Sequence, residues 1–324
     1  MTVETTASLH VLGLPIRHSR SPVFQNAALR AAGLDAVYTA REVDAAGMHE
    51  VAAQVRQGDV LGCNITLPHK ALAASLCDEL TADARACGVV NTWYRRGDRL
   101  VGDNTDIHGV RVSCAALLGR RAPRQVVVLG AGGAVSAALY AVAPLVERVV
   151  IVNRTPARAV EAWRLVADHL SRLPHVDVLP WPDDPTLAGA AAFPEAATSL
   201  DWSAVDLVLQ GTSLPVLRPD DAAPFAGFPI ERLPGHAGVL ELAYAARPTV
   251  LMRRAADAGL ATLDGATMLL HQGARSFWRW FDRDPDVVVM RDALADDLGR
   301  PRDAIPAHVD PAALRLWAGQ SIER

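Results

Sequence analysis

The sequence has few cysteines, few aromatic residues and no large excess of either charge. No pair at CxxC spacing and no histidine partner at zinc-finger spacing occurs among its four cysteines, Cys63, Cys77, Cys87 and Cys114. We therefore expect neither a metal site nor a disulfide framework, and a reducing compartment, the cytoplasm, fits this composition. The net charge of -4 gives no basic field for nucleic acid, which leaves a small neutral or anionic molecule as the candidate ligand.

The chain also lacks long uninterrupted apolar segments. Residues 126–146 carry no charge and approach the length of a membrane-spanning helix. Three glycines directly after a β-branched run, followed by an alanine-rich helical pattern, favour a buried strand, a tight turn and a buried helix instead. The first residues contain Glu4 and no long apolar run, so we expect neither a secretion signal nor a membrane protein.

The first third of the chain alternates apolar or β-branched runs with helical patterns. Hydrophobic residues make up 50% of the 324, which is ample for a packed core and for two domains. The patterns predict strands at 8–15, 36–44 and 62–68, helices at 21–33, 48–58 and 69–80, and then two strands about the turn at 96–98. This order is typical of a mostly parallel sheet with right-handed crossovers.

A second alternation of strands and helices follows a break at residues 120–124. We expect a hinge helix at 108–119, then helices after a glycine turn and at 156–170, with strands at 125–130, 148–155, 205–212 and 238–244. Residues 169–204 are rich in proline and alanine and predict irregular surface with one short strand at 175–179. An amphipathic helix at 267–281 and a polar helical tail beyond Asp284 complete an α/β fold of two α/β domains.

A glycine-rich turn follows the first strand of the second alternation. A strand before it and a helix after it are typical of a dinucleotide-binding turn, in which backbone N–H groups meet a pyrophosphate. The turn consists of Gly130, Ala131, Gly132, Gly133 and Ala134. The pattern is imperfect, because Val135 occupies the last small position of the fingerprint.

The end of the next strand bears on the choice of nucleotide. Asn153, Arg154 and Thr155 lie about where a Rossmann unit meets the adenosine ribose, and Arg158 follows them. An acidic residue there would repel a 2′-phosphate, whereas two arginines and a threonine hydroxyl would bind it, so the pattern favours NADP over NAD. The alternative is that both arginines only face solvent at a strand end.

The segment 62–70, GCNITLPHK, concentrates hydrogen-bonding groups at a predicted strand-to-helix junction. Lys70 is a candidate proton donor, since an ammonium can stabilise and protonate the oxygen of a ketone that accepts a hydride. Asp106, at the end of another strand, could orient that ammonium, and Asn91 could add an amide to the same pocket. The alternatives are a solvated lysine, and capping or Asx-turn roles for Asn104 and Asp106.

Four further polar residues are open to more than one interpretation. Ser21 fits the N-cap of a helix, whereas Ser19 is the serine that we assign to a ligand. Gln272 is either a ligand amide or a helix-surface residue. His69 either depresses the pKa of the neighbouring ammonium or faces solvent.

Taken together and in this order, these segments resemble the shikimate dehydrogenase family. The matching motifs run from about residue 11 to 281 and include GLPIRHSRSP, NITLPHK, GVVNT, GDNTD, GAGGA, NRTPARA and DGATMLLHQGARSF. The resemblance implies an enzyme that reversibly reduces 3-dehydroshikimate to shikimate with NADPH, on the pathway to chorismate and aromatic amino acids. We expect a small-molecule substrate, no nucleic-acid or membrane partner, and a monomer or homodimer.

The resemblance also implies roles for individual residues. Lys70 and Asp106 would be the catalytic pair, and the shikimate pocket would be lined by Ser19, Ser21, Asn64, Thr66, Asn91, Asp106, Tyr244 and Gln272. Residues 130–134 would hold the pyrophosphate, and the adenosine phosphate would bind at Asn153, Arg154, Thr155 and Arg158. The implied domains are 1–108 for substrate, completed by a helix at about 266–284, then 109–265 for NADP, with 285–324 as a C-terminal extension.

Several departures from the family pattern indicate a divergent member. Glu241 stands where an aspartate is usual, residues 210–215, QGTSLP, replace the usual asparagine-alanine start, and Ala266 and Thr267 stand where a glycine-containing turn is common. A quinate or aminoshikimate dehydrogenase and a non-catalytic NADP-binding sensor are therefore rival interpretations. Retention of Ser19 and Ser21 favours shikimate, and retention of the lysine and aspartate pair favours an enzyme.

Overall fold

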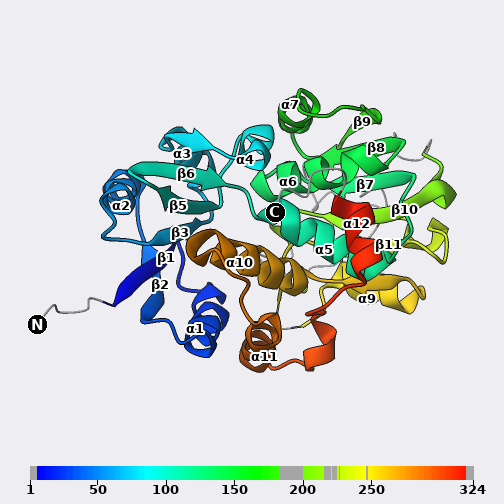
Figure 1. The fold of residues 1–324 in the computed structure, drawn as a ribbon. Coiled ribbons are helices and arrows are strands. Elements are labelled where there is room, and N and C mark those ends of the chain that lie inside the picture. The colour runs from blue at the N-terminus through cyan, green and yellow to red at the C-terminus, as the bar shows by residue number, and fades with distance from the viewer. Residues whose placement is uncertain are drawn as a thin grey trace, which may run out of the picture. The chain divides into compact units, whose positions relative to one another are not determined.

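The computed structural model describes residues 6–181, 200–214, 220, 225, 227–245 and 247–318. The chain forms two compact units, one of residues 1–109 with 269–307 and the other of residues 110–268 with 308–324. Each unit alternates strands with helices, which confirms the predicted α/β class (Figure 1). Within the described ranges, no helix combines the length and the apolar character needed to cross a membrane.

The first unit is built on a six-stranded sheet in the order β2-β1-β3-β5-β6-β4. The strands are β1 (Ala7–Gly13), β2 (Ala36–Glu42), β3 (Gly62–Ile65), β4 (Glu79–Leu80), β5 (Thr92–Arg96) and β6 (Arg99–Asp103). β5 runs antiparallel to β3 and β6, and the other neighbouring pairs are parallel. The sheet is therefore mostly parallel, as the sequence pattern predicts.

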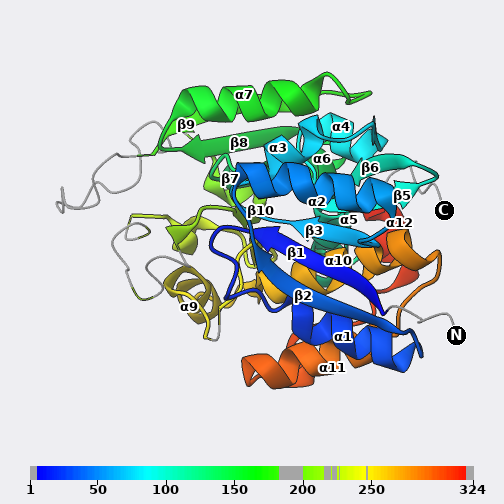
Figure 2. The same cartoon turned by 90° about the vertical axis from the view of Figure 1, so that its left-hand side faces the viewer.

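Helices cover both faces of this sheet. They are α1 (Ser21–Ala31), α2 (Ala45–Gln57), α3 (Lys70–Ser75), α4 (Ala82–Cys87), most of α10 (Gly265–Phe281), α11 (Val287–Leu298) and the short η6 (Arg302–Ala304). On one face, Met48 and Val51 of α2 and Ala73 of α3 pack with Leu12 and Trp93 of the sheet. α1 and α10 lie on the other face (Figure 1, Figure 2).

Two glycines let α10 approach its neighbours closely. A Cβ at Gly62 of β3 would overlap the indole nitrogen of Trp280, which donates to Trp93 O at 3.0 Å. A Cβ at Gly273 would lie 2.5 Å from the Phe24 ring of α1. Because a larger residue at either position would push α10 away, these glycines help to set the depth at which α10 packs.

The second unit is built on a six-stranded, fully parallel sheet in the order β12-β11-β10-β7-β8-β9. The strands are β7 (Gln125–Leu129), β8 (Arg148–Asn153), β9 (His175–Pro180), β10 (Val205–Gln210), β11 (Gly238–Glu241) and β12 (Ala261–Leu263). This is the Rossmann order, in which ligands bind outside the carboxyl ends of the strands where the order reverses. That point lies between β7 and β10.

The helices of the second unit bury the sheet from both sides. They are most of α5 (Asp106–Leu118), α6 (Gly133–Val142), α7 (Pro156–Ala167), α9 (Val250–Asp257) and α12 (Pro311–Ala318), with the short η1 (Ala143–Leu145), η3 (Trp202–Ala204) and η5 (Ile230–Arg232). Residues 126–129 of β7 have no exposed surface. A strand covered on both faces reads as a continuous apolar run, which accounts for the membrane-like stretch of sequence.

The irregular surface expected at 169–204 is only partly correct. Leu200 and Trp202 are 4% and 1% exposed and pack with Phe228 in the core of the second unit. The expected strand at 175–179 is present as β9. Residues 182–199 lie outside the described residues. Trp202 was missed because a single aromatic residue in a segment without periodic hydrophobic residues gives no pattern.

The segment beyond Asp284 is not a polar tail. Met290 and Leu294 of α11 are fully buried, α11 packs against α1, and Trp317 of α12 donates to Gly119 O at 3.2 Å. Residues 285–307 belong to the first unit and residues 308–318 to the second. Four further helices and strands have no counterpart in the predicted pattern: α4, α9, β12 and β4. The residues of β4 were expected to end a helix.

Candidate active site

Lys70 and Asp106 form a close ion pair in the first unit. Lys70 is the first residue of α3, after β3, and Asp106 is the first residue of α5, after β6. Lys70 Nζ donates to Asp106 Oδ2 at 2.5 Å, and the two side chains are 15% and 7% exposed. The structure thus brings the predicted proton donor to its predicted partner, at the carboxyl ends of two strands that run in the same direction.

Two amides orient Asp106. Asn91 Nδ2 donates to Asp106 Oδ1 at 2.8 Å, and the Asp106 N–H donates to Asn104 Oδ1 at 3.2 Å. Asn104 therefore makes the expected Asx-type turn. Asp106 is not an N-cap, because it is already the first helical residue of α5, and its carboxylate faces Lys70. Each carboxylate oxygen of Asp106 has a partner, so its orientation is set by the protein alone.

The Asn64 amide is also engaged inside the protein. Tyr38 O–H donates to Asn64 Oδ1 at 2.7 Å, and Asn64 Nδ2 donates to Ser276 Oγ at 2.8 Å and to Thr92 Oγ1 at 3.1 Å. Burial raises the pKa of Tyr38 well above its usual value, so the phenol keeps the proton that it donates. Asn64 is 5% exposed. What it has left for a ligand is the second lone pair of Oδ1.

Gln272 of α10 joins the same cluster. Its Oε1 accepts from Asn91 Nδ2 at 3.3 Å and from Thr105 Oγ1 at 3.4 Å, and its Nε2 donates to Leu269 O at 2.9 Å. Gln272 is 7% exposed, so its interpretation as a helix-surface residue is wrong. One hydrogen of Nε2 is left for a ligand, and the ligand-amide interpretation stays a prediction.

Ser19, Ser21 and Thr66 lie just beyond the carboxyl ends of β1 and β3. Ser21 is not the N-cap of α1: Arg20 occupies that position, and the Ser21 N–H donates to Ser19 Oγ at 3.3 Å. The N-cap prediction is therefore wrong, because Ser21 already belongs to the first helical turn. The half-buried Thr66 side chain makes no hydrogen bond to the described residues, so its hydroxyl is available to a ligand.

His69 is packed inside the first unit. It is 6% exposed, and its Nε2 lies 2.7 Å from Val43 O. The solvent-facing interpretation of His69 is therefore wrong. The imidazole instead ties the start of α3 to the segment that joins β2 and α2.

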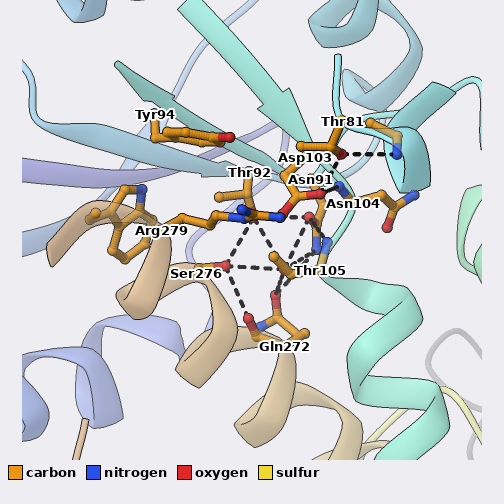
Figure 3. Close-up of polar contacts among 12 residues, drawn as sticks. Thr81, Asn91, Thr92, Tyr94, Asp103, Asn104, Thr105, Gln272, Ser276 and Arg279 are labelled. Carbon is orange, nitrogen blue, oxygen red and sulfur yellow. Dashed lines mark hydrogen bonds and ion pairs between the residues drawn. The ribbon is translucent and has the colours of Figure 1, made fainter. Parts of the chain in front are cut away.

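The sequence interpretation missed part of this network. Ser276, which has no exposed surface, shares hydrogen bonds with Thr92 at 2.9 Å and Thr105 at 3.1 Å (Figure 3). It lies four residues after Gln272, so helical spacing could have identified it as a neighbour on the same face. Arg279, three residues further along α10, pairs with a carboxylate of β6. Nothing in its local sequence marks it.

The glycine-rich turn lies between β7 and α6 of the second unit. Gly130 has a φ of 109°, which residues with side chains rarely adopt, and its N–H donates to Val152 O at 2.8 Å. Gly132 precedes α6 and gives it no side-chain cap. The N-terminus of α6 therefore offers uncapped N–H groups and positive potential, which fits a pyrophosphate.

Val135 fits this turn because Gly211 faces it. A Cβ at Gly211 would overlap Val135 Cγ2, and a Cβ at Gly130 would lie 3.1 Å from the carbonyl carbon of Gly211. Gln210 Nε2 donates to Thr212 Oγ1 at 2.7 Å, and the Thr212 N–H donates back to Gln210 Oε1 at 2.8 Å. The departures from the expected pattern at positions 135 and 211 therefore compensate for each other where β7 meets β10.

The predicted phosphate-binding residues lie at the end of β8. Asn153 Nδ2 donates to Thr155 O at 2.8 Å and closes the turn into α7. Arg154, Thr155 and Arg158 are exposed. Their exposure leaves them free to meet a phosphate from solvent, and it is equally compatible with arginines that only face solvent.

Glu241, the last residue of β11, is fully buried in the second unit. Its Oε1 accepts from Thr249 Oγ1 at 2.7 Å, whereas its Oε2 has no hydrogen-bond partner in the described part of the chain. Burial, with a smaller effect of the nearby Asp264 carboxylate, raises the pKa of Glu241 to about 7. Tyr244 follows three residues later and is half-buried.

The four cysteines are free thiols. Burial raises the pKa of Cys77 to about 12 and those of Cys63 and Cys114 further, so none of these three is an activated thiolate. Over the described ranges, no three or more histidine, cysteine, aspartate or glutamate side chains are grouped to hold a metal ion.

The chain is similar in sequence to shikimate dehydrogenases. Residues 11–93 match the family model of the shikimate dehydrogenase substrate binding domain, and residues 265–295 match that of the shikimate 5′-dehydrogenase C-terminal domain. Shikimate dehydrogenase (NADP(+)) of Symbiobacterium thermophilum is 37% identical over 295 residues, which cover 90% of this chain and 95% of that protein. The Brucella abortus protein of the same name is 33% identical over 293 residues, 90% and 94% of the two chains.

Solved structures share the fold. Thermus thermophilus shikimate 5-dehydrogenase in complex with shikimate has a TM-score of 0.70 at 28% identity, covering 90% of this chain and 99% of that one. A shikimate dehydrogenase in complex with NADP+ has a TM-score of 0.78 at 28% identity, with coverage of 90% and 96%. A 5-ketofructose reductase of Gluconobacter sp. strain CHM43 has a TM-score of 0.77 at 26% identity, with coverage of 91% and 99%.

Gly211→Ala should destabilise the protein only while Val135 is present. The added methyl would overlap Val135 Cγ2, and we expect the free energy of unfolding to fall by about 1–3 kcal/mol. Val135→Ala alone should cost a similar ~1–3 kcal/mol by leaving a cavity. In the double variant the new methyl occupies that cavity, so denaturant titration should give a coupling of at least about 1 kcal/mol. Strictly additive losses would contradict the compensation.

Stability should depend on pH through Glu241. Its pKa is about 7 in the folded protein and about 4.3 in an unfolded chain. Between these values the folded state keeps a proton that the unfolded state has released, so the free energy of unfolding falls with rising pH, by roughly 3 kcal/mol in total. Glu241→Gln keeps an acceptor for Thr249 and removes this titration.

The measurement is Tm of the wild type and Glu241→Gln between about pH 5 and pH 8. The difference in Tm should shift in favour of the variant as the pH rises toward 7 and should level off above the folded-state pKa. A difference that stays constant across this range would show that Glu241 does not titrate there.

Proposed function

The chain belongs to the shikimate dehydrogenase family, and from this premise we propose that it reversibly reduces 3-dehydroshikimate to shikimate with NADPH, on the pathway to chorismate and aromatic amino acids. The observation that carries the proposal is the Lys70–Asp106 pair beside a cluster of amides and hydroxyls in the first unit. The parallel sheet of the second unit has the Rossmann order that binds dinucleotides.

Lys70 is the only lysine of the chain, and the rest of its 32 basic residues are arginine. Arginine keeps its proton under all physiological conditions, whereas lysine can release and regain one. Of these two cations, only lysine can donate a proton in one direction of the reaction and accept it in the other. The single lysine of this chain, Lys70, donates to Asp106 Oδ2 at 2.5 Å.

We assign the proton transfer to this pair. In the reduction, the Lys70 ammonium stabilises the developing oxygen anion and gives it a proton. In the oxidation, the neutral amine accepts the hydroxyl proton, and Asp106 stabilises the ammonium that results. Bound NADPH supplies the hydride to the carbonyl carbon.

The polar residues around the pair suit a ring with several hydroxyl groups. The Thr66 hydroxyl, one hydrogen of Gln272 Nε2 and the second lone pair of Asn64 Oδ1 are left over after the internal hydrogen bonds are made. Ser19, in the segment between β1 and α1, and Ser21, the first residue of α1, add two hydroxyls. Asn91, whose amide is fully engaged, would act mainly by orienting Asp106 and Gln272. Tyr244, which belongs to the second unit, stays a substrate contact that only the family resemblance implies.

The proposed NADP site uses the switch point between β7 and β10. The pyrophosphate would lie at the uncapped N-terminus of α6, against residues 130–134. The 2′-phosphate would meet the exposed guanidinium groups of Arg154 and Arg158 and the Thr155 hydroxyl, with Asn153 shaping the turn. The cytoplasmic location and the choice between monomer and homodimer stay predictions.

The experiment that tests this function is an assay of purified protein with each substrate and each cofactor. Shikimate or quinate is offered with NADP or NAD, and formation of reduced nicotinamide is followed by absorbance. Turnover confined to shikimate with NADP supports both the pocket and the arginine arguments. Turnover with quinate would reject the substrate assignment, and turnover with NAD at equal kcat/KM would reject the phosphate site.

Silence in all four combinations would reject the proposal and favour a non-catalytic sensor. Because a 5-ketofructose reductase shares the fold, reduction of 5-ketofructose and of 3-dehydroshikimate with NADPH should be compared in the reverse direction. A preference for the ketofructose would move the chain to a different substrate class.

Lys70→Arg should abolish most turnover while the fold and the charge persist. The guanidinium can still pair with Asp106, but it cannot release a proton, so kcat should fall by about 10²–10⁴-fold. Arg30→Lys, the reverse exchange at an exposed position of α1, is the matched control and should leave kcat unchanged. A Lys70→Arg variant with wild-type kcat would remove Lys70 from proton transfer.

A further inference from the structure

The turn that carries Asp106 is held by side chains at each of its backbone N–H groups. The N–H of Asn104 donates to Asp103 Oδ1 at 2.8 Å, and that of Thr105 donates to Asn91 Oδ1 at 2.8 Å. The N–H of Asp106 donates to Asn104 Oδ1 at 3.2 Å. The N–H groups of Thr105 and Asp106 are donors that the start of α5 leaves unpaired, and that of Asn104 lies just before them. Their acceptors therefore decide how the chain enters α5 and where the Asp106 carboxylate lies.

Asp103 supplies the first of these acceptors and is buried. Its Oδ1 also accepts from Thr81 Oγ1 at 2.6 Å, and its Oδ2 accepts from Arg279 Nε at 2.6 Å. The side chain is 3% exposed. A carboxylate taken out of water in this way needs a cation beside it, and Arg279 is that cation.

Aromatic rings hold the Arg279 guanidinium. It lies 5.6 Å from the centre of the Tyr94 ring and 5.1 Å from that of the Trp278 ring. The Arg279 side chain, which is 19% exposed, runs alongside Tyr94 toward Asp103 (Figure 3). Cation–π contacts of this kind restrict where the guanidinium lies, so Arg279 presents a fixed donor to Asp103.

Arg279 is the last of three contacts along one face of α10. Gln272 meets Asn91, Ser276 meets Thr92, and Arg279 meets the end of β6 at Asp103. The spacing of four and then three residues places all three side chains on one stripe of the helix. α10 therefore contacts the segment that leads to Asp106 at successive points, although the paired residues are 176 to 184 positions apart in the sequence.

We infer that Arg279 is a positioning residue for the reaction: through Asp103 it fixes the turn that sets the Asp106 carboxylate against Lys70. The inference rests on the proposed function. A purely stabilising role is a poor explanation of the pair, because buried ion pairs contribute little net stability compared with apolar packing. The Arg279–Asp103 pair instead fixes the turn that leads to Asp106, the partner of Lys70. The orientation of reacting groups strongly affects the rate of a reaction.

The test compares Arg279→Met with Arg275→Met. Arg275 lies over the same Trp278 ring at 4.3 Å and makes no hydrogen bond to the described residues. Its loss therefore removes a similar cation that interacts with Asp103 through charge but without a hydrogen bond. Oxidation of shikimate and of shikimate deuterated at C3 is measured at saturating NADP. We expect kcat of Arg279→Met to fall by about 10–100-fold, with KM for NADP unchanged.

The primary deuterium isotope effect on kcat separates positioning from stability. If Asp106 is misplaced, the chemical step slows and limits turnover more fully, so the isotope effect rises. If Arg279→Met merely lowers the folded fraction, kcat per total protein falls and the isotope effect stays at the wild-type value, which would overturn the inference. Arg275→Met should keep both quantities within about twofold of wild type.

Arg279→Lys keeps a cation near Asp103 and carries the test if Arg279→Met does not fold. Its kcat should lie between those of wild type and Arg279→Met, with a raised isotope effect, because an ammonium lacks the planar fork that pairs with a carboxylate. An unchanged kcat in both Arg279 variants, or an equal loss in Arg275→Met, would overturn the inference alone. Wild-type protein that is inactive on every substrate would instead reject the proposed function, and the inference with it.

Discussion

The ion pair between Lys70 and Asp106 is the interaction on which the first unit depends. It joins the first turn of α3, which follows β3, to the first turn of α5, which follows β6. Only β5, which runs the opposite way, lies between these two strands. Burying two ionisable side chains with so little access to water is costly unless they pair with each other and their remaining polar atoms are hydrogen-bonded. Asn91, the Asx turn and side chains of α10 supply these hydrogen bonds. The packing of α10 therefore affects the position of the carboxylate that pairs with Lys70.

The surrounding amides illustrate how a polar pocket remains ordered. Asn64 and Asn91 use most of their hydrogen-bond donors and acceptors in bonds to protein groups. The protonated Tyr38 donates to the Asn64 oxygen and so fixes the orientation of that amide. Little rotational freedom is left to lose when a ligand binds. The groups that stay unused, above all the Thr66 hydroxyl, are few and point out of an already satisfied network, which restricts the hydroxyl patterns that a ligand can present.

Local patterns predicted most of the fold, and long-range contacts account for what they missed. Periodicity and glycine turns predicted nearly every strand of the two sheets, and short polar motifs at strand ends predicted Lys70 and Asp106 as partners. Trp202, α11 and Arg279 were missed because their importance comes from residues remote in the chain: a core shared with Phe228, a face of α1, a carboxylate on β6. In the sequence, Val135 looks like a defect of the glycine turn, because the glycine that makes room for it, Gly211, is far away in the chain. Only the structure shows that the two residues are neighbours.

Because Lys70 is the only lysine in the sequence, it can be labelled selectively and observed by NMR. Apart from the terminal amine, the chain has one primary amine to react with aldehydes, and it sits in a carboxylate-bound, mostly covered position. Reductive methylation with isotopically labelled formaldehyde would therefore place a single side-chain NMR resonance at Lys70, free of the crowding that many lysines cause. The chemical shift of that resonance would follow protonation of the amine during ligand titrations, and the ease of methylation would measure how far the side chain is covered.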